Sequence, residues 1–227
     1  MKNPFRNLTK FEFCLWCFSV LSVIISFLLL ENGDPLKLIA SIIGVTALIF
    51  TAKGYVIGQI LIVVFSLFYG FISFHARYYG EMITYLGMSS PIAILAAISW
   101  FKNPYKNTKE VAVNKPSRRQ ICTMLCLATV VSIAFYFILK YLGNASLTAS
   151  VLSVTTSFIA AYLTFLRSPY YALAYATNDV VLIVLWITAS TADPTNLPML
   201  ICFAVFLIND LYGFINWRRM QNRQIQS

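Results

Sequence analysis

Long apolar stretches separated by short polar ones make up almost the whole of the 227-residue chain. Each stretch is close to the roughly 20 residues that an α-helix needs to cross the hydrocarbon core of a membrane. Charges are rare inside the stretches, and Pro91 interrupts the fourth. The pattern predicts an all-α integral membrane protein with eight transmembrane helices, at about 11–30, 36–52, 55–74, 80–101, 120–142, 146–166, 170–190 and 196–217.

The basic residues between the stretches predict the orientation of the chain. With the N-terminus inside, all but three of the 17 Lys and Arg residues fall on the inner side, the exceptions being Lys37, Arg77 and Lys140. Short cytoplasmic loops of membrane proteins carry such an excess of Lys and Arg. We therefore expect both termini in the cytoplasm. The net charge of +9 then reflects topology and not a nucleic-acid-binding surface.

The sequence contains no motif that points to catalysis, a metal or a cofactor. The single histidine, His75, is expected at a loop end, and the chain has no Gly-rich phosphate loop and no nucleophile beside a base. The five cysteines fall in apolar stretches, and their odd number fits no closed disulfide framework. These observations argue against an enzyme and leave a transporter or, as a fallback, a membrane scaffold.

The second half of the chain repeats features of the first. The segment 41–46 (SIIGVT) is similar to 150–155 (SVLSVT), and 97–100 (AISW) is similar to 214–217 (FINW). We expect two parallel three-helix repeats joined by one linker helix, which is a 1 + (3 + 1 + 3) architecture. The expected units are an extra transmembrane helix in 1–35, a first repeat in 36–101, a basic cytoplasmic segment with the linker helix in 102–142, a second repeat in 146–217 and a cytoplasmic tail in 218–227.

Two Asn-Asp pairs, Asn178-Asp179 and Asn209-Asp210, lie inside apolar stretches. An ionised carboxylate at the centre of a membrane costs about 2.5–3.5 kcal/mol on insertion scales, and the neighbouring amide is a further polar group that hydrocarbon cannot satisfy. Such groups either hydrogen-bond between helices or line the path of a polar solute. Two pairs on neighbouring helices, surrounded by aromatic residues, favour a binding site over the structural alternative.

Helical spacing extends this candidate site to further residues. Tyr171, Tyr175, Asn178 and Trp186 share one face of their helix, with Asp179 at its edge. Trp100 and Trp217 end their stretches beside basic residues, so we expect them to be interfacial anchors. The candidate substrate-binding residues are Gln59, Ser66, Tyr69, Tyr175, Asn178, Asp179, Trp186, Phe206, Asn209, Asp210 and Tyr212.

Segments 171–186 (YALAYATNDVVLIVLW) and 209–217 (NDLYGFINW) resemble the PnuC-type nicotinamide riboside transporters. The resemblance implies a fold related to the SWEET-type sugar transporters, a bacterial inner membrane and a homotrimer. It also implies facilitated diffusion of a vitamin-like nucleoside. Many members carry a Trp-rich Glu-Trp motif where this chain has Ser168-Pro169-Tyr170-Tyr171.

The residue types of the candidate site favour a cationic heteroaromatic substrate. A pyridinium ring binds aromatic faces by cation–π attraction worth about 0.5–2 kcal/mol, and amides supply paired donors and acceptors for carboxamide and ribose groups. Thiamine, another cationic heteroaromatic, suits the same residues, whereas a neutral deoxynucleoside makes less use of two acids. A proton-coupled carrier that uses Asp179 or Asp210 as its relay is the remaining alternative.

Overall fold

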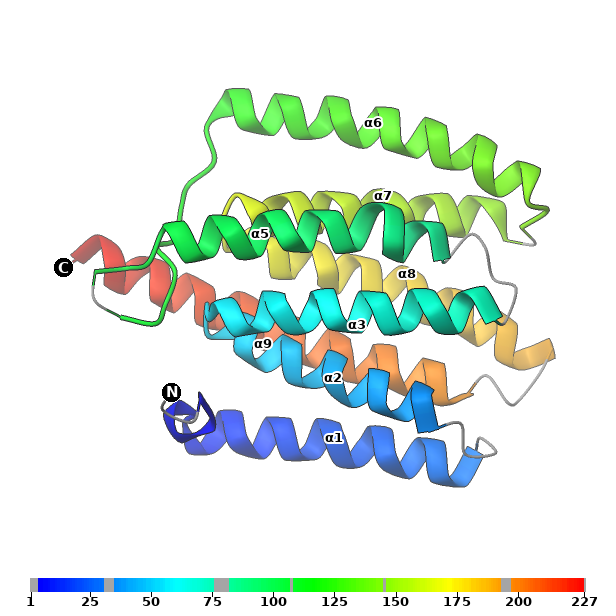
Figure 1. Cartoon of the computed structure of the whole chain (residues 1–227), viewed down its shortest axis with the longest axis horizontal. Helices are drawn as coiled ribbons and strands as arrows, with labels where there is room; N and C mark the ends of the chain where they lie inside the picture. The colour runs from blue at the N-terminus through cyan, green and yellow to red at the C-terminus, as the bar shows by residue number, and fades with distance from the viewer. Residues whose placement is uncertain are drawn as a thin grey trace.

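The computed structural model describes residues 4–30, 35–75, 82–106, 108–144, 146–192 and 197–226. The regular elements of this part of the chain are helices, as the apolar pattern predicts (Figure 1). In chain order they are η1 (Pro4–Asn7), α1 (Lys10–Leu30), α2 (Pro35–Ala52), α3 (Val56–His75), η2 (Thr84–Ser89), α5 (Ser90–Lys102), α6 (Arg118–Tyr141), α7 (Leu147–Phe165), α8 (Tyr170–Ala192) and α9 (Leu197–Gln226).

The predicted apolar stretches all coincide with helices, but they differ in length. Six of the helices in the described part are long and apolar enough to cross a membrane, where η2 and α5 count as one. The apolar parts of α2 and α3 are shorter, at Leu38–Ala52 and Val56–Ile72. The prediction of a helical membrane protein is confirmed, and eight crossings remain a prediction.

Pro91 changes the type of the fourth helix without breaking it. Proline has no N–H and its ring displaces the carbonyl one turn back, so it disrupts the interior of an ordinary α-helix. The chain forms a π-helical turn at Thr84–Ser89 just before it, and the Ser90 N–H donates to the Tyr85 carbonyl. Pro91 then lies at the start of α5, which continues directly from the π-helical turn.

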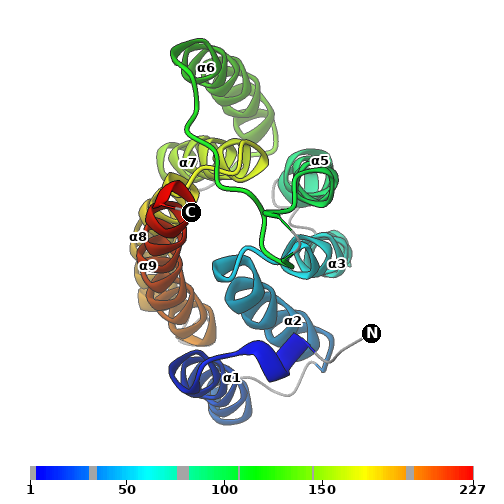
Figure 2. The ribbon, with the colours of Figure 1, turned by 90° about the vertical axis from the view of Figure 1, so that its left-hand side faces the viewer.

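Helices α2, α3, α5, α7, α8 and α9 form a closed ring, seen end-on in Figure 2. Each helix packs against the next in this order, and α9 closes the ring against α2. Helix α1 packs on α2 and α9 from outside the ring, and α6 packs on the outer side of α7.

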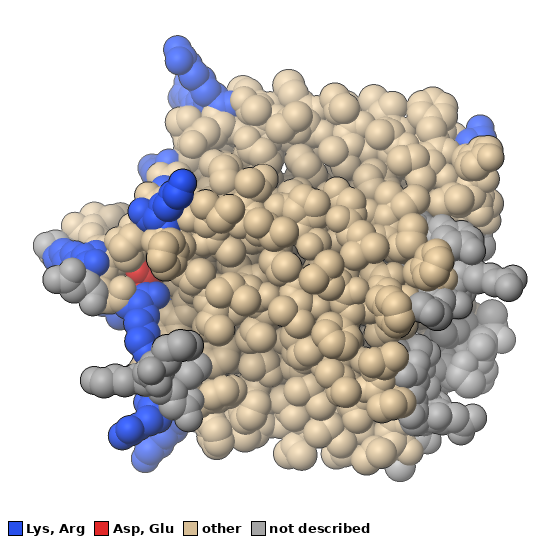
Figure 3. All heavy atoms as spheres, viewed as in Figure 1, with Lys and Arg blue, Asp and Glu red and all other residues tan. Residues whose placement is uncertain are grey.

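The outer surface of the bundle is suited to lipid. Large apolar side chains, such as Leu28, Phe137 and Val184, are exposed on α1, α6 and α8. Figure 3 shows an uncharged flank, with Lys and Arg gathered mainly at the end of the bundle where α1 begins and α9 ends. We name this end of the bundle the basic end. Continuous apolar exposure of this extent marks a membrane surface, so the chain is a multi-pass membrane protein.

Two helix corners at the basic end have the same backbone geometry. Helix α2 turns into α3 at Gly54, with φ of +68°, and α7 turns into α8 at Arg167, with φ of +59°. The Gly54 N–H donates to the Thr51 carbonyl and the Arg167 N–H donates to the Thr164 carbonyl, each at 2.9 Å. The left-handed conformation is ordinary for glycine and uncommon for arginine, so further contacts must hold the second corner.

Residues 110–114, which we name the strap, supply those contacts. The Val111 N–H donates to the Gly54 carbonyl and the Asn114 N–H donates to the Arg167 carbonyl, each at 2.9 Å. The Val111 side chain is buried in the core cluster that contains Trp100 and Trp217. The segment that leads into α6 therefore joins both corners, and through them the two halves of the ring.

Candidate functional site

Two carboxyl groups meet where α8 and α9 pack together. Asp179 and Asp210 are 3% and 5% exposed, and their side chains lie next to each other. Two ionised carboxylates side by side at such low exposure repel each other, and a shared proton or a bound cation would relieve that repulsion. The Asp179 Oδ2 atom is buried and has no hydrogen-bond partner among the described residues. The pair therefore retains capacity to bind a further group.

A small cavity lies close to the acids, between α3, α5, α7 and α8. Its volume is about 20 Å³, and its lining includes Gln59, Tyr175 and Thr164. Tyr175 lies on α8 one helical turn before Asp179, which places it near the acid pair. A space of this size holds about one water molecule. The predicted residues Gln59 and Tyr175 thus line this cavity, and Asp179 and Asp210 are not part of its lining.

A chain of aromatic contacts covers a second part of the candidate site. The Trp186 and Phe203 rings are stacked with centroids 6.5 Å apart, and Phe203 contacts Phe206 at 5.8 Å. Phe206 in turn contacts Phe65, whose ring lies 5.6 Å from that of Tyr69. The predicted Trp186, Phe206 and Tyr69 are therefore connected, through two phenylalanines that the sequence analysis did not select.

The amides of the two Asn-Asp pairs form hydrogen bonds with neighbouring helices. Asn178 Oδ1 accepts hydrogen bonds from Ser153 Oγ at 3.0 Å and Thr156 Oγ1 at 2.9 Å, both on α7. Asn209 Nδ2 donates to Ser19 Oγ on α1 at 2.9 Å. These amides join helices, although the Asn209 Oδ1 atom is buried without a partner among the described residues.

Tyr212 and Ser66 complete the predicted set. The Tyr212 hydroxyl donates to Glu12 Oε1 at 2.8 Å, and this contact joins α9 to α1. Glu12 also forms a buried ion pair with Lys53 at 2.8 Å, which the sequence analysis missed although Glu12 is the only acid in its apolar stretch. Ser66 is buried on α3. Tyr212 therefore lies with the α1 contacts and apart from the two acids.

The prediction that Trp100 and Trp217 are interfacial anchors is wrong. Both side chains are fully buried, and their ring centroids lie 5.2 Å apart. The Trp100 indole N–H donates to the Thr164 carbonyl at 2.8 Å, and the Trp217 indole N–H donates to the Thr51 carbonyl at 2.9 Å. These carbonyls belong to the last turns of α7 and α2, where backbone acceptors need partners from outside the helix. The tryptophans close the interior of the ring at its basic end.

Comparison with known proteins supports a transport function. A family model described as nicotinamide mononucleotide transporter matches residues 34–219. The nicotinamide riboside transporter PnuC of Neisseria mucosa is 25% identical over 227 residues, an alignment that covers 98% of this chain and 86% of the relative. The protein of the same description from Haemophilus influenzae is 23% identical over 190 residues, covering 83% of this chain and 81% of the relative.

A solved structure shares the fold. The crystal structure of the vitamin B3 transporter PnuC aligns with a TM-score of 0.81 and 24% sequence identity, covering 96% of this chain and 94% of the other. The arrangement of the helices described above is therefore one that an experimentally determined transporter also has.

Proposed function

The chain belongs to the nicotinamide mononucleotide transporter family, and from this premise we propose that it carries nicotinamide riboside, or a similar cationic nucleoside, by facilitated diffusion. The observation that carries the proposal is the Asp179–Asp210 pair, buried beside Tyr175 in the interior of a lipid-facing bundle. Two adjacent buried carboxyl groups favour a cation between them, and a pyridinium nucleoside carries a fixed positive charge. The aromatic contacts from Trp186 to Tyr69 offer faces for the flat ring.

The acid pair favours the nucleoside over the nucleotide that gives the family its name. A mononucleotide adds a phosphate, whose negative charge would be repelled by the acids at low dielectric. Helices α3, α7 and α8 contain no Lys or Arg that could offset it. The relatives from Neisseria mucosa and Haemophilus influenzae bear the name of the riboside, in agreement with this electrostatic argument.

We propose that the structure represents a conformation closed at the basic end. The Trp100–Trp217 pair and the strap lie between the acid pair and that end. The cavity of about 20 Å³ beside the acids is too small for a nucleoside, because ligand sites for molecules of that size measure roughly 300 Å³ or more. Transport then requires the two halves of the ring to separate. They would separate first around the aromatic contacts from Trp186 to Tyr69, and afterwards around the Trp100–Trp217 pair.

Matched contacts support two parallel three-helix repeats as the moving parts. The Trp217–Thr51 bond joins α9 to α2, and the Trp100–Thr164 bond joins α5 to α7 in the same way. The two corners carry the same backbone hydrogen bonds. The proposed units are the helix in 1–35, the repeats in 36–101 and 146–217, the linker in 102–142 and the tail in 218–227. They make a SWEET-like 1 + (3 + 1 + 3) arrangement with eight transmembrane helices.

The remaining parts of the proposal concern the membrane and the assembly. The gathering of Lys and Arg at one end of the bundle supports a cytoplasmic location for that end and for both termini. We further propose that the protein resides in a bacterial inner membrane and forms a homotrimer, in which the exposed apolar faces contact lipid or neighbouring subunits.

A proton-coupled carrier is the second candidate function, and the acid pair itself favours it. Buried acids that share a proton are suitable relays in transporters. A fixed cation could then replace the proton between Asp179 and Asp210 during each cycle. The riboside uniporter remains the first candidate because its substrate already carries the charge that the pair requires.

Binding to the purified protein tests the substrate. A ligand that binds only the folded state at a hundred times its Kd stabilises it by about 2.7 kcal/mol. We expect nicotinamide riboside to raise the melting temperature more than thiamine, riboflavin, deoxynucleosides or nicotinamide mononucleotide, and Asp179→Asn to reduce the effect. Tyr212→Phe is the matched control, because it changes a half-buried polar residue of α9 that contacts α1. A mononucleotide that stabilises the protein as strongly as the riboside would contradict the electrostatic argument.

A further inference from the structure

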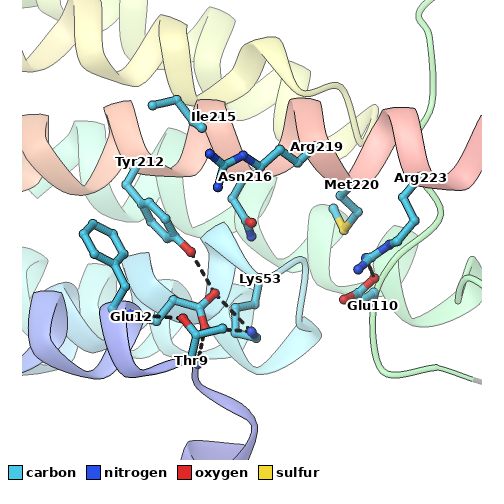
Figure 4. A pocket seen from close by; sticks show the side chains of 11 residues that line it. Thr9, Glu12, Lys53, Glu110, Tyr212, Ile215, Asn216, Arg219, Met220 and Arg223 are labelled. Carbon is cyan, nitrogen blue, oxygen red and sulfur yellow. Dashed lines mark hydrogen bonds and ion pairs between the residues drawn. The ribbon is translucent and has the colours of Figure 1, made fainter.

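A second, larger pocket opens at the basic end, on the side of α9 that faces α1 (Figure 4). Its volume is about 580 Å³. Because α1 lies outside the ring, this pocket is separate from the acid pair in the interior. Its lining comprises the charged residues Glu12, Lys53, Glu110, Arg219 and Arg223 and the neutral residues Thr9, Phe11, Tyr212, Ile215, Asn216 and Met220.

Glu12 contributes little charge to the open part of this pocket. Its carboxylate accepts hydrogen bonds from Lys53 Nζ at 2.8 and 3.0 Å, from the Tyr212 hydroxyl at 2.8 Å and from the Thr9 N–H at 2.6 Å. Only 2% of the residue is exposed. Lys53 neutralises the acid, and the surrounding donors occupy both carboxylate oxygens. The Glu12 carboxylate therefore acts as a structural contact whose oxygens are already occupied by donors of the protein.

The two arginines of the pocket retain binding capacity. Arg223 contacts Glu110 through one guanidinium nitrogen and is largely exposed, so its other donors are available. Arg219 forms no ion pair or hydrogen bond with any residue that the structure describes. Its positive charge acts on the neighbouring Tyr212 hydroxyl. After Glu12 is matched with Lys53 and Glu110 with Arg223, the charge of Arg219 remains uncompensated.

The positions of these arginines fit a phosphate group. Arg219 and Arg223 are four residues apart on α9, which places them one turn apart on the same face. Guanidinium groups bind phosphate oxygens through two parallel hydrogen bonds. Beside them, Phe11 is 62% exposed and Ile215 also presents its side chain to the surroundings. The pocket thus combines a cationic part with an apolar wall.

We propose that this pocket binds an organic phosphate, with the phosphate held by Arg219 and Arg223 and the apolar part of the ligand against Phe11 and Ile215. Two sources share this chemistry. One is the headgroup of an anionic phospholipid, which attracts basic residues near the membrane surface. The other is a water-soluble phosphate ester such as a nucleoside monophosphate, whose size the pocket accommodates.

Thermal unfolding of the full-length protein tests the proposal. The lipid probe is phosphatidylglycerol in nanodiscs, compared with phosphatidylcholine. The soluble probes are adenosine monophosphate and glycerol 3-phosphate in detergent, compared with sulfate at equal ionic strength. Arg219→Gln should weaken the apparent affinity for the active probe about tenfold or more, because a charge-assisted bond is lost. Arg119→Gln is the matched control, since Arg119 is an exposed residue in the first turn of α6.

Each outcome decides between the sources or rejects the site. A rise in melting temperature with phosphatidylglycerol alone identifies a lipid site, and a rise with the soluble esters identifies a site for a free organic phosphate. Arg219→Lys keeps the positive charge but lacks the planar guanidinium group with its paired N–H donors, so this variant should retain only part of the affinity for the phosphate. If no phosphate raises the melting temperature above its control, or if Arg219→Gln responds like the unchanged protein, the proposal is overturned.

Discussion

Buried hydrogen-bonding capacity distinguishes the residues that hold this bundle together from those that are available to a ligand. Asn178 accepts two hydrogen bonds from α7, and its oxygen is thereby satisfied. Asp179 lies next to it in sequence but faces Asp210 and keeps one oxygen without a partner among the described residues. A buried polar atom without a partner costs roughly 1–3 kcal/mol. Such a cost is understandable at a site that a polar substrate occupies during transport.

At the scale of single residues, Trp217→Phe should destabilise the protein by about 1–3 kcal/mol, because the Thr51 carbonyl loses the indole N–H in a buried environment. Trp100→Phe should cost a similar amount, since Trp100 makes the same contact with Thr164. Thermal unfolding of both variants in detergent measures the effect, with the exposed Phe101→Leu as the control. A loss below about 0.5 kcal/mol for both, typical of a surface position, would mean that these rings do not close the basic end.

At the scale of elements, close packing of α2 on α3 depends on Gly58. A Cβ atom added there would lie 2.4 Å from Thr51 Oγ1 and 2.5 Å from the Thr51 nitrogen. Backbone must therefore move, so we expect Gly58→Ala to destabilise the protein by about 1–3 kcal/mol. Gly87→Ala is the control, because its nearest neighbour would be Ile83 at 3.8 Å. Equal melting temperatures for the two variants would contradict the close approach.

The sequence was sufficient to predict the helices but not which of their faces are buried. Hydropathy located the described α-helices to within a few residues, except that α9 continues to Gln226 through the predicted tail, and adjacency of the last two helices brought Asp179 and Asp210 together. In a membrane protein, however, lipid-facing and buried faces are both apolar. Periodicity therefore could not separate the buried Trp217 from an interfacial anchor, nor select Phe65 and Phe203 from the many phenylalanines.

Contacts between distant segments account for the other residues that the sequence analysis missed. Lys53 pairs with Glu12 across 41 positions of the chain. The strap is fixed by backbone groups of the corners and by Gln224, whose side chain accepts from the Val113 N–H at 2.8 Å and donates to the Val111 carbonyl at 3.1 Å. Main-chain pairing of this kind leaves no pattern in side-chain types, so the sequence does not reveal these contacts of the basic segment.

At the scale of the whole molecule, the basic end should face the cytoplasm. In a cysteine-free background, a membrane-impermeant thiol reagent added outside should label a cysteine that replaces Asp193 and should not label one that replaces Lys109. A reporter fused after Ser227 should be active only when the readout is cytoplasmic. The reverse labelling pattern would place the strap and both termini on the outer side and reject the proposed orientation.

The central claim is that this protein moves a fixed cation through the Asp179–Asp210 site without coupling to protons. Uptake of labelled nicotinamide riboside into proteoliposomes that contain only this protein tests it most directly. We predict equal concentrations inside and outside at zero membrane potential, whether or not a pH gradient is present. An interior-negative potential of about 100 mV should favour the inside by about 2.3 kcal/mol. Accumulation driven by the pH gradient alone, and abolished by Asp179→Asn or Asp210→Asn, would contradict the claim and identify a proton-coupled carrier.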